Sequence, residues 1–326
     1  MPVIEVVDLH KSYRVARQRG GVFGALRHLA AGEYTDVRAV DGISFAVERG
    51  EMLGYVGPNG AGKSTTIKML TGILVPTSGH VSVCGLVPHR QRVQVAERIG
   101  VVFGQRTQLW WDLPLVDSLE LLRYIYRVPA ERFRANLDRF RQLLELDPFL
   151  STPVRQLSLG QRMRGELAAA LLHDPEIVYL DEPTIGLDVV AKQRIREFLR
   201  GINQERGVTV ILTTHDMSDI EQLCSRLMIV DHGKLLYDGV LAGIRDRFGR
   251  ERTLVVDLAE DAPPIELPTA RQVRADGPRR WLRFNRGDVS AAELIAQVAA
   301  RYPLTDLTIE EPEIEAIIRR IYEGGL

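Results

Sequence analysis

The sequence predicts an α/β fold class, in which helices cover both faces of a largely parallel sheet. Residues 177–181 and 208–213 are apolar runs without polar alternation, which is typical of strands that are buried on both faces. From residue 52 to residue 231 such strands alternate with helical stretches. Near residues 247–252 this pattern stops and a shorter α/β pattern begins, so we expect a second, smaller domain.

The composition is that of an ordinary globular protein. The 326 residues exceed what one hydrophobic core usually serves, and 42 basic side chains against 43 acidic ones indicate no nucleic-acid partner. Cys84 and Cys224 lie far apart and form no CxxC pair, which argues against a zinc site or a disulfide framework and fits a reducing, cytosolic compartment. The start of the chain does not resemble a signal peptide, and no apolar run approaches the roughly 18 residues of a membrane span. We therefore expect any membrane association to depend on a partner.

The first two predicted strands, residues 3–8 and 42–48, bracket a stretch at residues 14–37 that looks inserted. Its charged and apolar residues at near-helical spacing predict a short basic amphipathic segment. Two interpretations remain open: a solvated surface loop with a helical turn, and a contact surface for a membrane or a partner. The residues concerned are Arg14, Arg17, Arg19, Phe23, Leu26, Arg27, Leu29, Ala30, Glu33 and Asp36.

The remaining elements follow in order along the chain. In the larger domain we expect strands at residues 53–57, 81–85, 99–103, 177–181, 208–214 and 226–231, and helices from residue 63, within residues 114–173 and at residues 189–206. In the smaller domain we expect a strand at residues 253–258 and a hairpin at residues 270–285 that turns at Asp276 and Gly277. Ser290 and Glu293 form a predicted capping box for a helix to Arg301, and a strand and a helix end the chain.

A phosphate-binding loop is predicted at residues 57–64, GPNGAGKS, because they fit GxxxxGK[ST] between an apolar strand and a helix. Glycines let successive backbone N–H groups point at phosphate oxygens, and the helix adds its positive end. Lys63 then reaches the β- and γ-phosphates and the Ser64 hydroxyl ligates Mg²⁺. The expected ATP-binding residues here are Gly57, Pro58, Asn59, Gly60, Ala61, Gly62, Lys63, Ser64 and Thr65.

Two acidic residues follow the apolar strand at residues 177–181, within the segment IVYLDE. Asp181 emerges at the end of this strand, where its carboxylate holds Mg²⁺ through water. Glu182 stands beside it, placed to orient and deprotonate the attacking water as a general base. An apolar strand that ends in two acids is common, and it is the phosphate loop in the same chain that gives this pair a predicted catalytic role.

Residues 157–188, LSLGQRMRGELAAALLHDPEIVYLDEPTIGLD, resemble the core of ABC (ATP-binding cassette) transporter ATPases, which place LSGGQ just before the second magnesium motif. The resemblance covers about residues 3–245. It implies a P-loop NTPase cassette at residues 1–248, with a mixed sheet core and a helical subdomain at about residues 105–173. Residues 249–326 form the small C-terminal α/β domain, which looks like the tail of bacterial drug and polysaccharide exporter ATPases.

Ser158 is, from the residues alone, a natural N-cap for a helix that runs through Leu172. The resemblance implies a further role for the signature residues Ser158, Leu159, Gly160 and Gln161. Two copies pair head to tail, and Ser158 and Gly160 of one copy contact the γ-phosphate that is bound to the other. Leu159 replaces the usual glycine, from which we expect altered packing rather than lost binding.

Four more roles follow from the resemblance. Gln105 matches the glutamine that senses Mg²⁺ and the attacking water, and His215 in TTHD matches the histidine that steadies the γ-phosphate. Asp188 matches the aspartate that couples the two sites of the dimer. Tyr13 matches the aromatic that stacks on adenine, which needs only a π-face. Because the insertion puts 44 positions between Tyr13 and Gly57, Phe23 and Tyr34 are alternatives for the adenine contact.

The function that the resemblance implies is that of the ATP-binding and ATP-hydrolysing subunit of an ABC transporter, of the exporter type. Such a subunit works with Mg²⁺ as a homodimer or with a paired ATPase subunit, on the cytoplasmic face of a separately encoded membrane permease. Trp110 and Trp111 lie where such ATPases dock a helix of the permease. The other interpretation is that both tryptophans are buried in the helical subdomain.

Other classes of protein would require sequence features that can be checked here. A soluble ABC ATPase that acts on ribosomes or DNA carries two cassettes or a long coiled coil, and neither is present. A P-loop kinase needs an acceptor site and leaves LSLGQ and TTHD unexplained. An importer remains open because the cassette does not reveal the direction of transport, and the sequence does not indicate the substrate.

Overall fold

The computed structural model describes residues 2–16, 34–104, 106–248 and 251–323. The chain divides into two compact units, Met1–Asp238 and Gly239–Leu326. This division assigns α9 (Leu241–Phe248) to the second unit, whereas the domain boundary that we predicted follows residue 248. Within the described ranges, no helix is both long enough and apolar enough to cross a membrane.

The first unit is built around a six-stranded sheet with the order β5-β6-β7-β3-β8-β9. Neighbouring strands from β5 to β8 pair in parallel, and β3, β6 and β7 are almost entirely buried, as their apolar sequences predict. The strands are β3 (Met52–Val56), β5 (Ile99–Phe103), β6 (Ile177–Asp181), β7 (Thr209–Thr213), β8 (Arg226–Asp231) and β9 (Lys234–Val240). This parallel core confirms the predicted α/β fold class.

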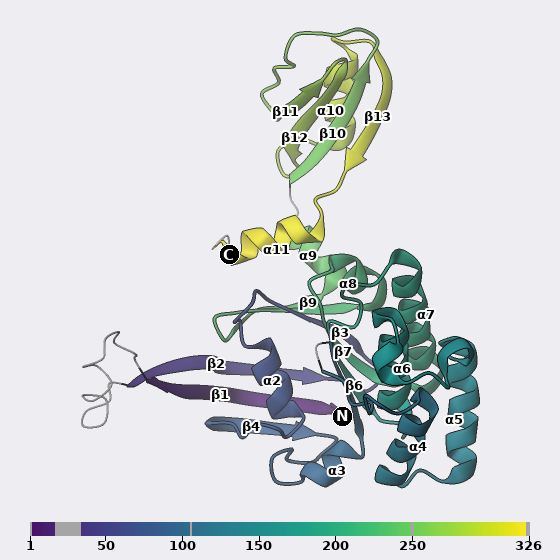
Figure 1. Cartoon of the computed structure of the whole chain (residues 1–326). Helices are drawn as coiled ribbons and strands as arrows, with labels where there is room; N and C mark the ends of the chain where they lie inside the picture. The colour runs from purple at the N-terminus through teal and green to yellow at the C-terminus, as the bar shows by residue number, and fades with distance from the viewer. Residues whose placement is uncertain (1, 17–33, 105, 249–250, 324–326) are drawn as a thin grey trace, which may run out of the picture. The chain divides into compact units, whose positions relative to one another are not determined.

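Helices connect and cover these strands (Figure 1). Four of them are α2 (Lys63–Leu70), α3 (Arg92–Ala96), α7 (Val189–Arg206) and α8 (Met217–Leu223). Between β5 and β6 the chain forms α4 (Leu115–Ile125), α5 (Ala130–Leu143), two 3₁₀ turns (Asp147–Phe149 and Val154–Gln156) and α6 (Leu159–Leu171). Gly100 lets α6 approach β5, because a Cβ there would lie 2.2 Å from the carbonyl oxygen of Ala170. The helices between β5 and β6 lie within the residues for which we predicted a helical subdomain.

A separate antiparallel sheet, with the order β2-β1-β4, contains β1 (Ile4–Ala16), β2 (Tyr34–Val47) and β4 (Ser78–Val83). Both ends of the predicted amphipathic segment belong to these strands, since Arg14 pairs with Asp36 and Val15 with Thr35. The prediction for residues 14–16 and 34–37 was therefore wrong. Cross-strand pairing and β-branched side chains extend the hairpin beyond the predicted strands 3–8 and 42–48. Phe23 and the rest of residues 17–33 lie outside the described residues.

The second unit contains an antiparallel sheet with the order β11-β12-β10-β13 and its own hydrophobic core. Its elements are β10 (Glu251–Leu258), β11 (Ala270–Asp276), β12 (Arg279–Asn285), α10 (Ala291–Ala299), β13 (Leu304–Glu310) and α11 (Ile314–Tyr322). The predicted hairpin is confirmed, with Gly277 at a φ of 52° in the turn. The predicted capping box of Ser290 and Glu293 is also present at the start of α10.

Candidate active site

The predicted phosphate loop runs from the end of β3 to the start of α2, and two glycines let it pack closely on the chain around it. A Cβ on Gly57 would lie 2.3 Å from the carbonyl oxygen of Val230, and a Cβ on Gly62 would lie 2.3 Å from that of Ala39. Gly62 also has a φ of 103°, which side chains strongly disfavour. Both positions therefore require glycine, and the loop has a fixed shape.

Lys63 begins α2 and folds back over this loop. Its Nζ donates hydrogen bonds to the carbonyl oxygens of Gly57, at 2.5 Å, and Pro58, at 3.1 Å. Burial lowers the pKa of Lys63, while the nearby carboxylates of Glu182 and Asp181 oppose that shift. The ammonium group is thus close to both predicted catalytic acids. An ATP phosphate is a stronger acceptor than these carbonyl groups.

Asp181 and Glu182 stand at the end of β6, beside the end of β7. The hydroxyl of Thr213 donates to Asp181 Oδ1 at 2.5 Å, and the backbone N–H of Glu182 donates to the Thr213 carbonyl at 2.9 Å. The two acids are therefore held by a neighbouring strand. Sequence reasoning did not identify Thr213, although a polar residue at the end of the buried strand 208–214 was the available signal.

His215 lies next to the Glu182 carboxylate. Its backbone N–H donates to Glu182 Oε2 at 3.4 Å, and its Nε2 is 3.5 Å from Glu182 Oε1. Burial raises the pKa of Glu182, and the interaction with His215 opposes that shift. The site thus combines a partly desolvated carboxylate with an adjacent histidine, an arrangement suited to accepting a proton from water.

A magnesium ion fits the donors that are present at this site. Mg²⁺ prefers hard oxygen ligands and usually retains several waters, with one or two carboxylates and the phosphates of the substrate. The Ser64 hydroxyl is exposed at the start of α2, and the Asp181 carboxylate is close to the preceding Lys63. Gln105, the third predicted metal residue, lies outside the described residues.

The signature residues form the start of α6. The Ser158 hydroxyl accepts a hydrogen bond from the backbone N–H of Gln161 at 3.2 Å, and the Ser158 N–H donates to Gln161 Oε1 at 2.9 Å. This capping box confirms the predicted N-cap role of Ser158. Ser158 is exposed, and α6 directs its first-turn N–H groups toward the same end of the helix.

Leu159 and Gly160 pack against the segment that leads into α7. A Cβ on Gly186 would lie 2.9 Å from Leu159 Cδ2, and a Cβ on Gly160 would lie 3.7 Å from Leu187 Cδ2. Asp188 accepts a hydrogen bond from the backbone N–H of Ala191 at 2.8 Å and caps α7. In this chain, the residue that was predicted to couple two sites is therefore also an N-cap.

Tyr13 lies on β1 opposite Val37, with its side chain 37% exposed and Lys11 Nζ 5.3 Å from the ring centroid. Tyr34, the alternative adenine contact, is more exposed, and Arg14 Cζ lies 5.8 Å from its ring centroid. Phe23 is outside the described residues. The assignment of the adenine contact stays a prediction.

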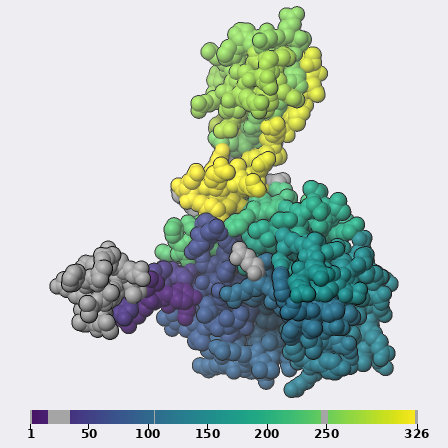
Figure 2. Space-filling view, viewed as in Figure 1, coloured from purple at the N-terminus to yellow at the C-terminus, as the bar shows by residue number. Residues whose placement is uncertain are grey.

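Trp110 and Trp111 are 38% and 49% exposed, which excludes the interpretation that both are buried in the helical subdomain. They lie in the loop between β5 and α4. Leu121, Tyr124 and Ile125 on α4 are exposed as well. Blue-to-teal residues of this helical region form one side of the first unit in the space-filling view (Figure 2).

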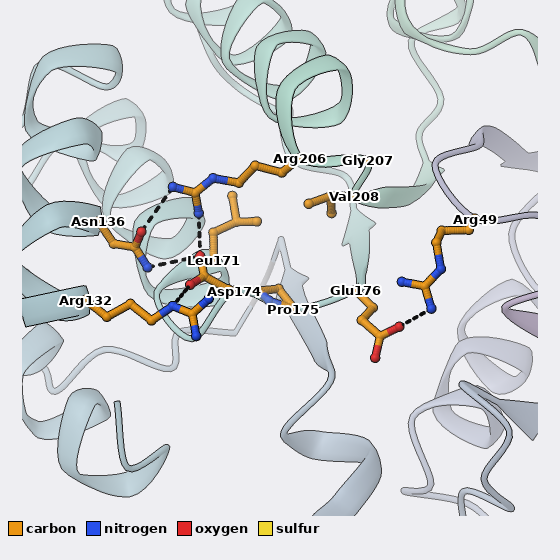
Figure 3. A pocket seen from close by; sticks show the side chains of 10 residues that line it. All are labelled: Arg49, Arg132, Asn136, Leu171, Asp174, Pro175, Glu176, Arg206, Gly207 and Val208. Carbon is orange, nitrogen blue, oxygen red and sulfur yellow. Dashed lines mark hydrogen bonds and ion pairs between the residues drawn. The ribbon is translucent and has the colours of Figure 1, made fainter. Parts of the chain in front are cut away.

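A polar cavity of about 470 Å³ lies between α5, α7 and the end of α6, and none of the predicted site residues lines it. Its charges are paired (Figure 3). Asp174 forms an ion pair with Arg132, with 2.5 Å between Oδ2 and Nε, and accepts a hydrogen bond from Arg206. Glu176 accepts a hydrogen bond from Arg49. Asn136 joins the same network through Arg206 and Asp174. We therefore interpret this cavity as part of the framework that connects the helices.

Comparisons with known proteins identify the family of the chain. A family model described as ABC transporter matches residues 40–185. The chain is 38% identical to the Nod factor export ATP-binding protein I of Ralstonia nicotianae over 63% of its own length and 64% of that protein. It is 31% identical to the ABC transporter ATP-binding protein NatA of Bacillus subtilis over 64% of its own length and 84% of NatA. The chain thus spans slightly less than two thirds of the Nod factor relative.

Solved structures give the same result. An ATP-binding subunit of an ABC transporter matches with a TM-score of 0.63 and 26% identity, over 76% of this chain and 93% of that one. The cassette MJ0796, solved as a dimer in a post-hydrolysis state with ADP and Pi, matches with a TM-score of 0.61 and 26% identity, over 73% of this chain and 98% of that one. The chain therefore belongs to the ATP-binding proteins of the ABC transporter family.

Proposed function

We propose that this subunit hydrolyses Mg-ATP in a head-to-tail dimer and powers export through a separately encoded membrane subunit, at the cytoplasmic face of the membrane. The observation that carries the proposal is the grouping of Lys63, Asp181, Glu182 and His215 beside the phosphate loop. Ser158, by contrast, is exposed at the start of a different helix. An exposed helix N-terminus is suited to bind an anion that another copy presents.

Each residue of the site has a distinct role in this proposal. Lys63 leaves the Gly57 and Pro58 carbonyls for the β- and γ-phosphates, which the backbone N–H groups of the loop also bind. Glu182 accepts the proton of the attacking water, and His215 contacts the γ-phosphate and keeps the carboxylate oriented. Mg²⁺ held near Ser64 and Asp181 would neutralise charge on the phosphates.

Dimerisation makes ATP a bridge between two copies. Ser158 and the N–H groups of α6 in one copy contact the γ-phosphate at Lys63 of the other, and Asp188 links the two sites. ATP therefore favours the closed dimer, and hydrolysis removes that preference. The membrane subunit responds to this change, and Trp110 and Trp111 are suitable anchors for it because aromatic residues dominate many interfaces.

The direction of transport is inferred from relatives. The names of the Ralstonia protein and of the Escherichia coli protein YbhF, described as a probable multidrug ABC transporter ATP-binding protein and 38% identical over 64% of this chain and 35% of its own length, favour export. Import and a role outside transport are the alternatives. Dimeric solved cassettes support the paired arrangement.

The experiment that tests the catalytic site is Glu182→Gln. The variant keeps the size of the side chain but removes the base, so we expect intact Mg-ATP binding, a stable ATP-bound dimer and turnover lower by about 10²- to 10⁴-fold. Phosphate release measures turnover, and light scattering measures the dimer. Glu120→Gln on the exposed surface of α4 is the matched control. Wild-type turnover in Glu182→Gln would rule out this base.

The same Glu182→Gln variant, because it holds the dimer closed, also tests for the membrane partner. Purified from detergent-solubilised cells with Mg-ATP, it is expected to retain a polytopic membrane protein, and replacing Trp110 and Trp111 by alanine should reduce that protein in the eluate. Recovery of soluble partners alone would contradict the transporter role.

A further inference from the structure

The loop from Arg106 to Pro114, here called the tryptophan loop, carries both exposed tryptophans and follows β5 directly. Its backbone groups form hydrogen bonds with the Ser118 side chain on α4 and with Arg155 in the 3₁₀ turn Val154–Gln156. The Trp110 N–H donates to the buried hydroxyl of Ser118 at 3.2 Å, and the Arg155 N–H donates to the Trp111 carbonyl at 3.0 Å. The loop is therefore ordered while it presents two large aromatic side chains to solvent.

A buried carboxylate of α6 holds the first part of this loop. Glu166 is 4% exposed, and its carboxylate accepts hydrogen bonds from the Thr107 hydroxyl and from the Gln108 backbone N–H, the latter at 3.3 Å. The Gln108 side chain donates in return to the Glu166 backbone carbonyl at 3.3 Å. Three hydrogen bonds thus connect one residue of α6 to two consecutive residues of the tryptophan loop.

Two neighbours of Glu166 on α6 contact the same loop. Arg162 is one helical turn earlier, on the same face, and its guanidinium lies 6.0 Å from the ring centroid of Trp111. Gly165 admits Leu109, because a Cβ there would lie 3.2 Å from Leu109 Cδ1. One face of α6 therefore contacts the loop from Thr107 to Trp111.

Burying the Glu166 carboxylate costs desolvation free energy. Burial raises the pKa of Glu166, while the hydrogen bonds from Thr107 and Gln108 oppose the shift. The residues that follow it in α6, from Leu167 to Leu171, are apolar or small and fully buried. An apolar side chain would avoid the desolvation penalty but would not hold the loop in one register.

We propose that Glu166 is a positioning residue that makes the tryptophan loop and the signature helix α6 move as one body. Ser158 caps this helix about 12 Å from Glu166, since the two residues are eight positions apart at a rise of about 1.5 Å each. A displacement of Trp110 and Trp111 therefore moves the signature residues, which contact ATP in the other copy. Conversely, ATP contact at the signature residues displaces the two tryptophans. The inference rests on the proposed dimer and membrane contact, and it adds the link between them.

Tryptophan fluorescence tests the link in the whole chain. The sequence has three tryptophans, so that Trp281→Phe leaves Trp110 and Trp111 as the emitters. In this background without nucleotide, Glu166→Ala and Thr107→Val should both increase acrylamide quenching, because each frees the loop from α6. Glu120→Ala is the control. Thr107→Val removes the same hydrogen bond but keeps Glu166. It therefore shows whether an effect of Glu166→Ala comes from the lost hydrogen bond rather than from a folding defect.

The second measurement adds Mg-ATP in a background of Trp281→Phe and Glu182→Gln. Dimerisation should change the emission of Trp110 and Trp111. With Glu166→Ala the monomer should bind ATP equally well, but dimerisation should no longer change the emission. Glu166→Gln keeps one acceptor oxygen for Thr107 and should restore part of the response.

The outcomes separate this inference from the proposed function. The reference protein is the chain with Trp281→Phe and Glu182→Gln and no other change. The inference would be overturned if Glu166→Ala changed neither the quenching nor the ATP response. It would also be overturned if the reference protein dimerised without a change in its emission. A reference protein that never dimerises counts against the proposed function instead. The quenching comparison needs no dimer, and equal quenching there would still overturn the role of Glu166.

Discussion

Glu182 has a φ of 56°, a backbone conformation that residues other than glycine rarely adopt. Such a conformation costs of order 1–3 kcal/mol and persists because neighbouring structure imposes it. Here the imposing contact is the hydrogen bond from the Glu182 N–H to the Thr213 carbonyl on β7. The carboxylate that we propose as the general base is therefore placed by the sheet rather than by local preference.

The two cysteines show how burial controls reactivity at single residues. Both are free, and burial raises the pKa of Cys84 to about 11 and that of Cys224 to about 12. Because the thiolate is the reactive form, its population at neutral pH is far smaller in the folded protein than in the unfolded chain.

We therefore predict slow reaction of both thiols with a disulfide reagent at pH 8. The rate in the native protein should be on the order of a hundredfold lower than in denaturant, and the rate at Cys84 should rise with pH up to about 11. Absorbance of the released thiolate measures the rate, and Cys224→Ala assigns the two phases. A rapid native reaction at pH 8 would contradict this prediction.

At the scale of elements, a buried ion pair joins α7 and α8 to the loop after β6. Asp219 in α8 is 0% exposed, and it accepts hydrogen bonds from Arg196 Nε in α7, at 2.6 Å, and from the Thr184 hydroxyl. Thr184 lies between Glu182 and Asp188 in the sequence. The orientation of the loop after β6, which follows the proposed base Glu182, thus depends on how α7 and α8 pack.

Asp219→Ala should lower the free energy of unfolding by about 3–5 kcal/mol, because it leaves the Arg196 charge buried without its partner. Denaturation by urea measures the change. The control is Asp138→Ala, which removes an exposed partner of Arg141 and should cost at most about 1 kcal/mol. Similar losses in both variants would show that the Asp219 pair is not buried in solution.

At the scale of the whole molecule, the proposed function needs two copies that exchange parts of their sites. The phosphate loop belongs to one copy and the signature residues to the other. Lys63→Ala should weaken ATP binding to the monomer, whereas Ser158→Arg should leave that binding intact and block ATP-driven dimerisation. Each ATP site of the dimer is thus a composite site, with the phosphate loop from one copy and the signature residues from the other. Lys63→Ala alters the first half of this site and Ser158→Arg the second.

Mixing the two variants tests this exchange directly. Each variant alone should be inactive, but a mixed dimer has one intact site, with Lys63 from the Ser158→Arg copy and Ser158 from the Lys63→Ala copy. Up to about a quarter of wild-type ATPase activity should return, since about half of the dimers are mixed and each has one site. No recovery, together with normal dimerisation of Ser158→Arg, would exclude the composite site.

The sequence by itself determined the features that depend on neighbouring residues. Several motifs could be predicted because each forms its hydrogen bonds with backbone groups only a few positions away. They are the phosphate loop, the caps at Ser158 and Ser290, and the hairpin turn at Gly277. The buried parallel strands were readable for the same reason, since their apolar runs reflect burial on both faces. These local signals were sufficient to predict the fold class and the phosphate site.

Only the tertiary structure decided which distant side chains meet. The support of Asp181 by Thr213, the contact of Glu166 with the tryptophan loop and the extension of the β1–β2 hairpin all join segments that are far apart in the sequence. Such contacts depend on strand register and helix packing, which a pattern of residue types does not encode. The exposure of Trp110 and Trp111 was undecided for the same reason, because burial depends on the whole packed surface.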